Sequence, residues 1–357
     1  MMKILITGIC GFVGCTLAEA LLDLSIPGSL TLMGLDNLSR PGSWLNRERL
    51  SNRGIAVYHG DIRQASDLEI FDSPDWIIDC AANPSVLAGR DGKTSSRQLV
   101  EHNLLSTLNL LEVCKRWQSG FILISTSRVY SIQSLTSFEL AVRDDAFYPT
   151  GEPFPPGMTE KGIAEPFSTS APISLYGASK LASETLALEY GYCFDFPVII
   201  NRCGVMAGAG QFGRPDQGIF AYWLHSWREK KPLRYIGFGG SGHQVRDCLH
   251  PKDLARLVLM QVGKSDLAQK TPICNVSGGV SSAYSLKQLS RWCENRWGSH
   301  AVNADLSPRP FDLPWVVLDS SLAQQVWDWT PSISTEEIIT EIANFADIHP
   351  EWLQLST

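Results

Sequence analysis

The sequence predicts an α/β fold, in which a doubly wound parallel sheet is followed by a smaller C-terminal α/β domain. Two observations predict it. Between residues 2 and 202, short apolar runs alternate with helical patterns, which is the rhythm of successive βαβ units. The first run passes directly into Gly8, Gly11 and Gly14 at the start of a helical pattern, as in many dinucleotide-binding sheets. We therefore expect a Rossmann-type sheet in the first part of the chain.

The strands of this sheet are predicted where short apolar runs stand between turn signals. Met2–Thr7 is the first strand, and the helix that follows the glycines extends to Leu24. Asn103 lies in the middle of the next long helical pattern. Further strands are expected over residues 30–35, 56–59, 76–80, 121–125 and 197–202, and further helices over 95–116 and from Tyr176 to about 192.

Residues 131–174 have no clear periodicity and are rich in proline, serine and aromatic side chains. An irregular stretch of this length inside a compact domain is usually a functional loop or a partly disordered segment. We therefore predict neither helices nor strands there.

Beyond residue 203 the rhythm of the chain changes. We expect residues 1–203, joined by about 245–275, to form the dinucleotide-binding domain, and 204–244 with 276–357 to form a substrate domain. Helices of this second half are predicted over residues 219–230, 251–262, 284–297 and 334–346.

Composition excludes several classes of function. The net charge of −7 argues against a nucleic-acid surface, and no apolar stretch approaches the ~20 residues of a membrane span. Nine cysteines without a Cys-x-x-Cys pair suggest neither a metal site nor a disulfide framework. A reducing cytoplasm fits this cysteine usage, and the N-terminus lacks the layout of a signal peptide.

The glycine turn and the end of the second strand predict the cofactor. Gly8 permits a tight turn, Gly11 lets the backbone approach a pyrophosphate, and Gly14 lets the helix pack close to the strand. Asp36, which lies 22 residues beyond Gly14, is placed to bond ribose hydroxyls and to repel a 2′-phosphate. NAD is therefore favoured over NADP, although Arg40 is close enough to keep NADP as an alternative.

Tyr176 and Lys180 are four residues apart and share one face of a helix. A phenol has a pKa of about 10, and a neighbouring ammonium favours the phenolate. A shift of roughly 3 units, or about 4 kcal/mol, would make Tyr176 a base at neutral pH. The alternative is an exposed lysine beside a half-buried tyrosine. Thr126 ends the fifth strand, where ligands collect in parallel sheets, although its hydroxyl would also suit a bond to local backbone.

Four sequence features together resemble the extended short-chain dehydrogenase/reductase family over essentially the whole chain. They are Thr7-Gly8-x-x-Gly11-x-x-Gly14, Asp36-Asn37-Leu38, Thr126 before Val129-Tyr130, and Tyr176-x-x-x-Lys180. Within that family the chain is similar to the nucleotide-sugar epimerases, and more narrowly to the CDP-paratose 2-epimerases, through Gln211-Phe212-Gly213, Asp216-Gln217-Gly218 and the motif over 242–247.

This resemblance implies a role for each matching residue. Thr126, Tyr176 and Lys180 would be the catalytic residues. Gln211, Gln217, Arg246 and Arg309 would hold the nucleotide diphosphate. The residues that would contact NAD are Gly8, Gly11, Phe12, Val13, Asp36, Asn37, Asp61, Ile62, Ala81, Asn103, Tyr176 and Lys180.

The resemblance also implies an activity, namely transient oxidation of a nucleotide sugar to a keto-sugar and re-reduction on its opposite face at C2 of a CDP-hexose. Two departures, Met206-Ala207-Gly208 and Leu313-Pro314, lie near the expected sugar pocket. The implied assembly is a homodimer or homotetramer in the cytoplasm.

Three other functions stay open. A UDP-sugar 4-epimerase would use the same catalytic residues. A nucleotide-sugar 4,6-dehydratase or reductase would too, but family dehydratases carry Asp-Glu where this chain has Ser127-Arg128. A dinucleotide sensor without catalysis is the non-enzyme alternative.

Overall fold

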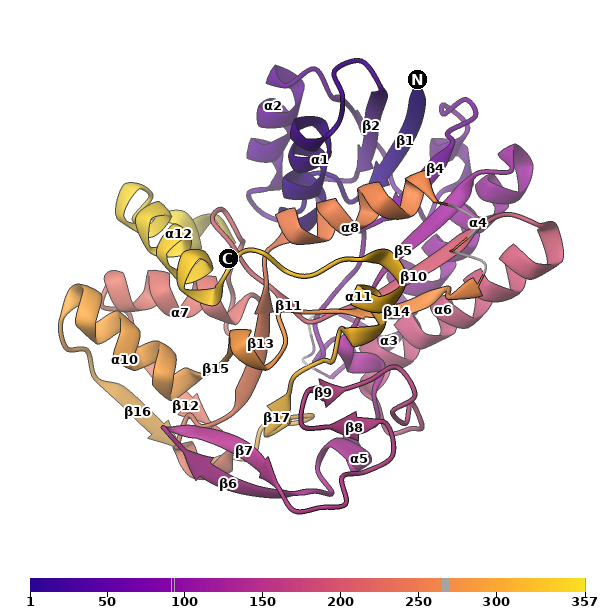
Figure 1. The fold of residues 1–357 in the computed structure, drawn as a ribbon. Helices are drawn as coiled ribbons and strands as arrows, with labels where there is room; N and C mark the ends of the chain where they lie inside the picture. The colour runs from indigo at the N-terminus through magenta and orange to yellow at the C-terminus, as the bar shows by residue number, and fades with distance from the viewer. Residues whose placement is uncertain (91, 93, 265–266, 268–269, 357) are drawn as a thin grey trace.

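The computed structural model describes residues 1–90, 92, 94–264, 267 and 270–356. It confirms the predicted fold class. A seven-stranded sheet, parallel throughout, carries helices on both faces, and a smaller α/β part lies beside it (Figure 1). Its strands, in spatial order, are β14 (Ile273–Val276), β10 (Val198–Cys203), β5 (Gly120–Thr126), β4 (Trp76–Asp79), β1 (Met2–Thr7), β2 (Leu30–Asp36) and β3 (Ala56–His59).

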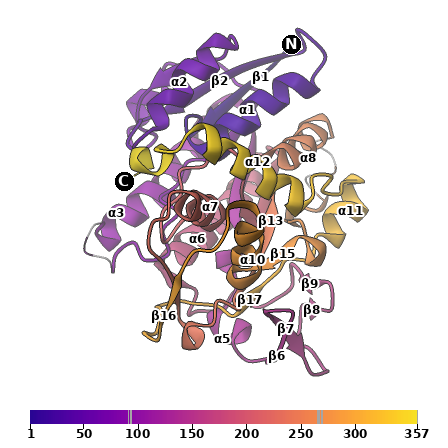
Figure 2. The same cartoon turned by 90° about the vertical axis from the view of Figure 1, so that its left-hand side faces the viewer.

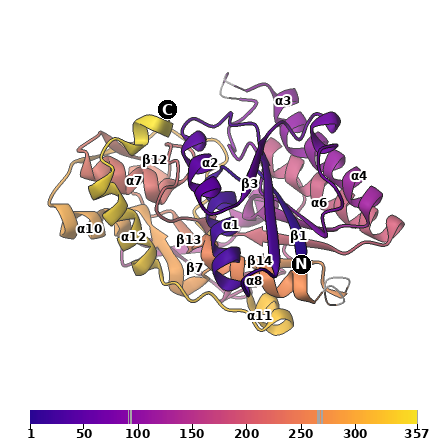
Figure 3. The same ribbon diagram turned by 90° about the horizontal axis from the view of Figure 1, so that it is seen from above.

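Helices cover both faces of the sheet (Figure 3), and one hydrophobic cluster on each face holds them in place. One cluster joins the sheet to α1 (Phe12–Leu24) and α8 (Pro251–Gly263), with α2 (Ser43–Asn52) beside α1. The other joins it to α4 (Ser106–Trp117) and α6 (Ser174–Phe194). Strands buried on both faces need continuous apolar runs, which is why these strands were visible in the sequence.

The long helix predicted over 95–116 is interrupted. It consists of α3 (Ser96–Val100), a π-helical turn (Glu101–Leu105) and α4. Ser95 starts it with a capping box that includes Gln98. Single π turns inside helices are frequent at functional sites, and this one carries Asn103.

The smaller part contains a second sheet and a helical layer. Its sheet consists of β11 (Val205–Met206), β13 (Val245–Leu249), β15 (Ala283–Ser285) and β17 (Trp315–Val316), and β12 (Leu233–Ile236) pairs with β16 (Val302–Asp305). Its helices are α7 (Ile219–Arg228), α10 (Leu286–Trp297) and α12 (Thr335–Ile348), with α12 packed on α7 (Figure 2). Another helix, α11 (Ser321–Trp327), packs on α8.

The chain crosses between the two parts more than once. Within the segment 245–275, β13 belongs to the second sheet, α8 packs against α1, and β14 starts at Ile273 as the seventh strand of the first sheet. The crossings place loops of both parts around the carboxyl ends of β1, β4 and β5, where ligands bind in such sheets.

Residues 131–174 are more ordered than we expected. The segment forms α5 (Ile132–Leu135) and two hairpins, β6 (Glu139–Arg143) with β7 (Ala146–Thr150) and β8 (Met158–Thr159) with β9 (Gly162–Ile163). Side chains of the segment share a hydrophobic cluster with residues 313–318. The prediction of an irregular stretch was wrong because these strands are too short to show a period and depend on packing far along the chain.

Candidate active site

One cavity of about 620 Å³ lies between the first sheet and the smaller part. Its wall runs from the glycine turn, past the end of β5, to the loops of the smaller part. The chain therefore brings residues of all three predicted groups, cofactor, catalytic and substrate, to one space. The predicted residues in its wall are Gly8, Gly11, Phe12, Val13, Thr126, Tyr176, Gln211, Gln217, Arg246 and Arg309. The predicted residues that are not in this wall are Asp36, Asn37, Asp61, Ile62, Ala81, Asn103 and Lys180.

The glycine turn has the shape that a pyrophosphate requires. Gly8 has a positive φ of 63°, and a Cβ there would lie 2.8 Å from the Cα of Ala81. A Cβ on Gly14 would collide with the carbonyl oxygen of Gly8. Helix α1 begins with Gly11 as its N-cap and has no side-chain cap, so its first N–H groups are left for an anion. This cradle fits the phosphates of a dinucleotide.

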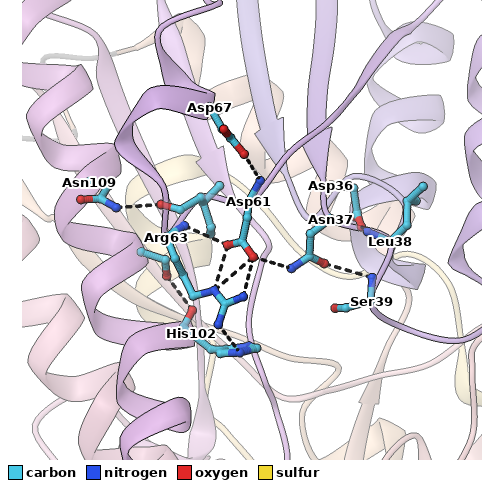
Figure 4. Close-up of polar contacts among 11 residues, drawn as sticks. Asp36, Asn37, Leu38, Ser39, Asp61, Arg63, Asp67, His102 and Asn109 are labelled. Carbon is cyan, nitrogen blue, oxygen red and sulfur yellow. Dashed lines mark hydrogen bonds and ion pairs between the residues drawn. The ribbon is translucent and has the colours of Figure 1, made fainter.

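Two carboxylates lie at the ends of β2 and β3 in opposite environments. Asp36 accepts hydrogen bonds from the backbone N–H groups of Cys10 (2.9 Å) and Leu38 (2.8 Å), and burial raises its pKa. Asp61 accepts from Arg63 at 2.6 Å, and this hydrogen bond holds the pKa of Asp61 well below its usual range. Asn37 also donates to Asp61, at 3.2 Å (Figure 4).

Arg63 was missed by the sequence analysis, although its position two residues beyond Asp61 is the local signal for such a pair. The pair fixes Asp61 and leaves Asn37 between the two strand ends (Figure 4). Ile62, between them, is buried, and its carbonyl accepts a hydrogen bond from Asn109 at 2.9 Å. The predicted cofactor residues at these strand ends are thus held by protein contacts.

Arg40 is hydrogen-bonded to the smaller part of the chain. Its guanidinium donates to Gln217 Oε1 and, at 2.6 Å, to the carbonyl of Phe212. Burial lowers the pKa of Arg40 to about 10. Because its side chain ties down the loop over 211–218, Arg40 is poorly placed to receive a 2′-phosphate. This contact weakens the NADP alternative.

Asn103 braces the turn after β4 against α6. Its Oδ1 accepts from the N–H of Asn83 (2.8 Å), and its Nδ2 donates to the Asn83 carbonyl (3.2 Å) and to Ser179 Oγ (3.0 Å). The side-chain amide of Asn103 therefore forms its hydrogen bonds with other protein groups. It would influence a bound cofactor indirectly, by holding the turn that contains Ala81 and Asn83 in place.

Tyr176 and Lys180 are both buried on α6, with 7% and 2% of their surfaces exposed. Burial raises the pKa of Tyr176 to about 12, opposed by a hydrogen bond with Thr126 and by the charge of Arg128. The expected downward shift driven by Lys180 is therefore not present in this structure. The reason is that burial outweighs the favourable interactions of the phenolate, and that the cation acting on it is Arg128, whereas the carboxylates whose charges act on Lys180 are two others.

Those carboxylates are Asp79 on β4 and Glu184 on α6. Glu184 forms a buried ion pair with Arg202 of β10 at 2.7 Å. The sequence analysis did not identify either residue. A signal was present for Glu184, since it lies four residues beyond Lys180 and so continues the helix face of Tyr176 and Lys180.

Three arginines, Arg128, Arg246 and Arg309, lie in the wall of the cavity. Arg246 lies 3.7 Å from Asp312, and Arg128 donates to the carbonyl of Phe311 at 3.1 Å. Burial, together with the charges of Arg246 and Arg309, lowers the pKa of Arg128 to about 9. An anion would relieve this repulsion. In the sequence, Arg128 was noted only because family dehydratases carry an acidic residue at that position. Its place in the wall of the cavity was not predicted.

Gln211 and Gln217 each present a polar atom with no partner among the described residues. These atoms are Gln211 Oε1 and Gln217 Nε2, both buried. The other polar atoms of these amides are used, since Gln211 Nε2 donates to Met206 O at 2.8 Å. An acceptor and a donor without protein partners in the cavity wall fit a polar ligand.

Within the described part of the chain, no group of three His, Cys, Asp or Glu side chains is arranged to hold a metal ion. Among the described helices, none combines the length and the apolar character that crossing a membrane requires.

The sequence profile of the NAD dependent epimerase/dehydratase family matches residues 4–277. A CDP-paratose 2-epimerase of Salmonella typhi is 28% identical over 345 residues, which cover 94% of this chain and 96% of that protein. A UDP-glucuronate 4-epimerase of Thermodesulfobacterium geofontis is 27% identical over 353 residues, covering 96% and 95%. The structure of UDP-glucuronic acid 4-epimerase from Bacillus cereus with UDP-glucuronic acid and NAD has a TM-score of 0.75 at 25% identity, covering 97% of this chain and 99% of that one.

Proposed function

Because the chain belongs to the NAD dependent epimerase/dehydratase family, we propose that it epimerises a nucleotide sugar by transient oxidation and re-reduction at one carbon. The observation that carries this proposal is that one cavity has the glycine turn, Thr126 and Tyr176, and the arginines of the smaller part in its wall. A dehydratase is disfavoured, because Ser127 and Arg128 offer no carboxylic acid to expel a hydroxyl group.

NAD is the cofactor of the proposed reaction, and the chain offers it a fitting cradle. The first turn of α1 would hold the pyrophosphate, and Asp36 would accept from ribose hydroxyls. When bound, NAD supplies the capacity to take a hydride from the sugar carbon and to return it. Asn37, Asp61, Ile62, Ala81 and Asn103 would shape the rest of this end.

Tyr176 would move the proton of the reacting hydroxyl group. Its pKa in this structure is too high for a base at neutral pH although the charge of Arg128 already lowers it, so a bound cationic ring would have to lower it further. Thr126, which is hydrogen-bonded to the phenol, would orient it. Lys180 would supply positive charge behind it. The raised pKa is useful in the second half of the reaction, since a protonated Tyr176 returns the proton.

The first candidate substrate is a CDP-hexose that reacts at C2. The Salmonella typhi relative and the motifs around Gln211, Gln217 and Arg246 support it. In this candidate the buried amide atoms of Gln211 and Gln217 would read the nucleotide, and Arg246 with Arg309 would bind the diphosphate.

The second candidate is a UDP-hexuronate that reacts at C4. Arg128 favours it, because a diphosphate alone would engage Arg246 and Arg309 and leave the partly buried cation Arg128 beside Tyr176. A carboxylate on the sugar would neutralise that cation. The Thermodesulfobacterium geofontis relative is consistent with this candidate.

One experiment tests the proposal and separates the candidates. The purified protein is incubated with CDP-, UDP- and dTDP-hexoses and with UDP-glucuronate, and products are followed by NMR. We expect one epimer, and a deuterium placed at the epimerised carbon should remain in the product. Loss of the label to solvent would indicate proton abstraction next to a carbonyl group and would contradict the mechanism. The expected homodimer or homotetramer stays a prediction for light scattering.

A further inference from the structure

The buried ion pair of Glu184 and Arg202 joins α6 to the first sheet. The Glu184 carboxylate accepts from Arg202 Nε at 3.1 Å and from Arg202 Nη2 at 2.7 Å, and only 2% and 6% of the two side chains are exposed. Taking both charges out of water costs about as much free energy as their attraction returns, so such a pair adds little net stability. Stability alone therefore does not explain why it lies in the core.

Glu184 contacts two neighbouring strands at once, because its carboxylate also accepts a hydrogen bond from the hydroxyl of Ser125. Ser125 and Arg202 are register partners on the parallel strands β5 and β10, so their side chains leave the same face of the sheet. One carboxylate thus fastens α6 to both strands, at the position directly before Thr126.

Arg202 extends this connection to residues that follow Thr126. Its guanidinium lies 5.2 Å from the centroid of the Tyr130 ring, and its Nη1 lies 3.4 Å from both the Tyr130 hydroxyl and the Glu165 carbonyl. Tyr130 in turn donates to Asn275 of β14 at 2.7 Å. The ion pair therefore lies where α6, the end of β5 and the segment 131–174 meet.

The pair can act on the active site only through the elements that it joins. Glu184 lies eight residues beyond Tyr176 on α6, which is roughly 12 Å along the helix axis, and neither member of the pair is in the cavity wall. Its anchoring nevertheless fixes where α6 stands relative to the strand that ends in Thr126. A displacement of about 1 Å between reacting groups can cost roughly 10²-fold in rate.

We propose that Glu184 and Arg202 are positioning residues, whose buried ion pair holds α6 against the ends of β5 and β10 and so sets the place of Tyr176 beside Thr126. The role in catalysis rests on the proposed function, but the placement of Tyr176 does not. The placement is therefore tested by measurements that need neither substrate nor turnover.

The first measurement is a double-mutant cycle in denaturant with Glu184→Met, Arg202→Met and the double variant. Each single variant leaves one buried charge without its partner and should unfold at a lower denaturant midpoint. The double variant removes both charges, keeps the net charge of the protein, and should unfold at a higher midpoint than either single variant. Simple addition of the two single effects would show that the residues do not act as a pair and would overturn the proposal.

The second measurement reports on Tyr176 itself. In protein labelled with ¹³C at the tyrosine Cζ atoms, the Tyr176 signal is identified by its absence from Tyr176→Phe. We expect this signal to shift in the double variant although stability is recovered, because the phenol moves relative to Thr126. Glu184→Gln, which fills the same space without the charge, should give a shift even if the double variant does not fold. An unchanged Tyr176 signal would overturn the proposal.

A matched control lies on the same strand. Asn201, the residue before Arg202, forms two buried hydrogen bonds with Gln261 of α8, at 2.9 and 2.8 Å. Because successive side chains of a strand leave opposite faces, Gln261→Met breaks a buried pair on the face away from α6. It should lower the unfolding midpoint and leave the Tyr176 signal in place. An equal shift in this control would indicate a general loosening of the sheet and would contradict the proposal.

The catalytic role has its own readout. If the protein is active, the double variant should lose roughly 10²-fold in kcat while its affinity for NAD, measured by calorimetry, changes little. Gln261→Met should keep the wild-type kcat per folded molecule. Recovery of kcat together with stability in the double variant would reject the catalytic part. Absence of epimerase activity in the wild-type protein would count against the proposed function and leave the unfolding and NMR results interpretable.

Discussion

Tyr176 lies in an environment that stabilises its phenol form, since burial outweighs the effects of Thr126 and Arg128. The residue is thus poised to donate a proton until a ligand adds positive charge. A residue whose protonation changes with ligand binding can serve both directions of a reversible proton transfer. The expectation from the motif, a lowered pKa of Tyr176, was wrong because the four-residue spacing of Tyr176 and Lys180 carries no information about burial.

Replacement of Tyr176 by phenylalanine tests this role. We expect turnover to fall by about 10²–10⁴-fold, which is the usual contribution of a general acid–base group. NAD affinity, measured by calorimetry, should change little because the ring stays in place. Tyr190→Phe is the matched control, since Tyr190 is bonded to Glu112 at 2.7 Å away from the cavity. Unchanged turnover in Tyr176→Phe would remove the tyrosine from the mechanism.

His225 offers a prediction on stability rather than activity. Burial in α7 lowers the pKa of His225 to about 4, whereas an unfolded chain has a histidine pKa of about 6.5. Between these values the unfolded state binds the proton and the folded state does not, so stability falls as pH falls from 6.5 towards 4. The loss from this group should approach ~3 kcal/mol.

The measurement is urea unfolding at pH 4.5, 5.5 and 7 for wild type and His225→Gln. The variant should lose less stability across this range, because glutamine does not titrate. Identical pH dependence in both proteins would show that His225 is not buried as described.

At the scale of elements, α6 is positioned by contact of its backbone with the turn that follows β5. A Cβ on Gly177 would collide with the carbonyl oxygen of Arg128. The helix therefore approaches this turn as closely as glycine allows, and that approach sets where Tyr176 stands relative to Thr126 and Arg128.

Gly177→Ala should therefore disturb the site although alanine is the better helix former by about 1 kcal/mol. We expect a lower unfolding midpoint and at least a tenfold loss of turnover. Gly263→Ala is the matched control, since nothing lies within 4 Å of a Cβ at that helical residue. If both variants behave alike, the close approach does not position Tyr176.

Strands and helices of the first sheet could be predicted because apolar runs and helical periods are local signals. The prediction of six strands matched β1, β2, β3, β4, β5 and β10 closely. The seventh strand, β14, was not predicted, because its four residues include the polar Asn275 and do not form a continuous apolar run. The π turn around Asn103 was hidden because a single extra residue in a helix barely alters its period.

At the scale of the whole molecule, the cavity depends on how the two parts meet, which no local pattern encodes. Motifs identified Thr126 and Tyr176 for the first part and Arg246 for the second, and the structure places all three in one wall. Partnerships across the fold were not predictable in the same way. Arg40, for example, donates a hydrogen bond to Gln217, which lies 177 residues further along the chain.

Because the predicted cofactor and substrate residues line one cavity, we expect the binding of the two ligands to be coupled. NAD at the glycine turn and a nucleoside diphosphate at Arg246 would each bind only the folded protein, so each should raise the melting temperature. At 100 times its dissociation constant, each ligand contributes about 2.7 kcal/mol. Because Arg40 already ties the loop over 211–218 to the first part, we expect the two ligands together to stabilise by more than their sum. Melting curves with NAD, CDP, UDP and each pair measure this, and ligands that compete instead of cooperating would show that the two ends are one overlapping site.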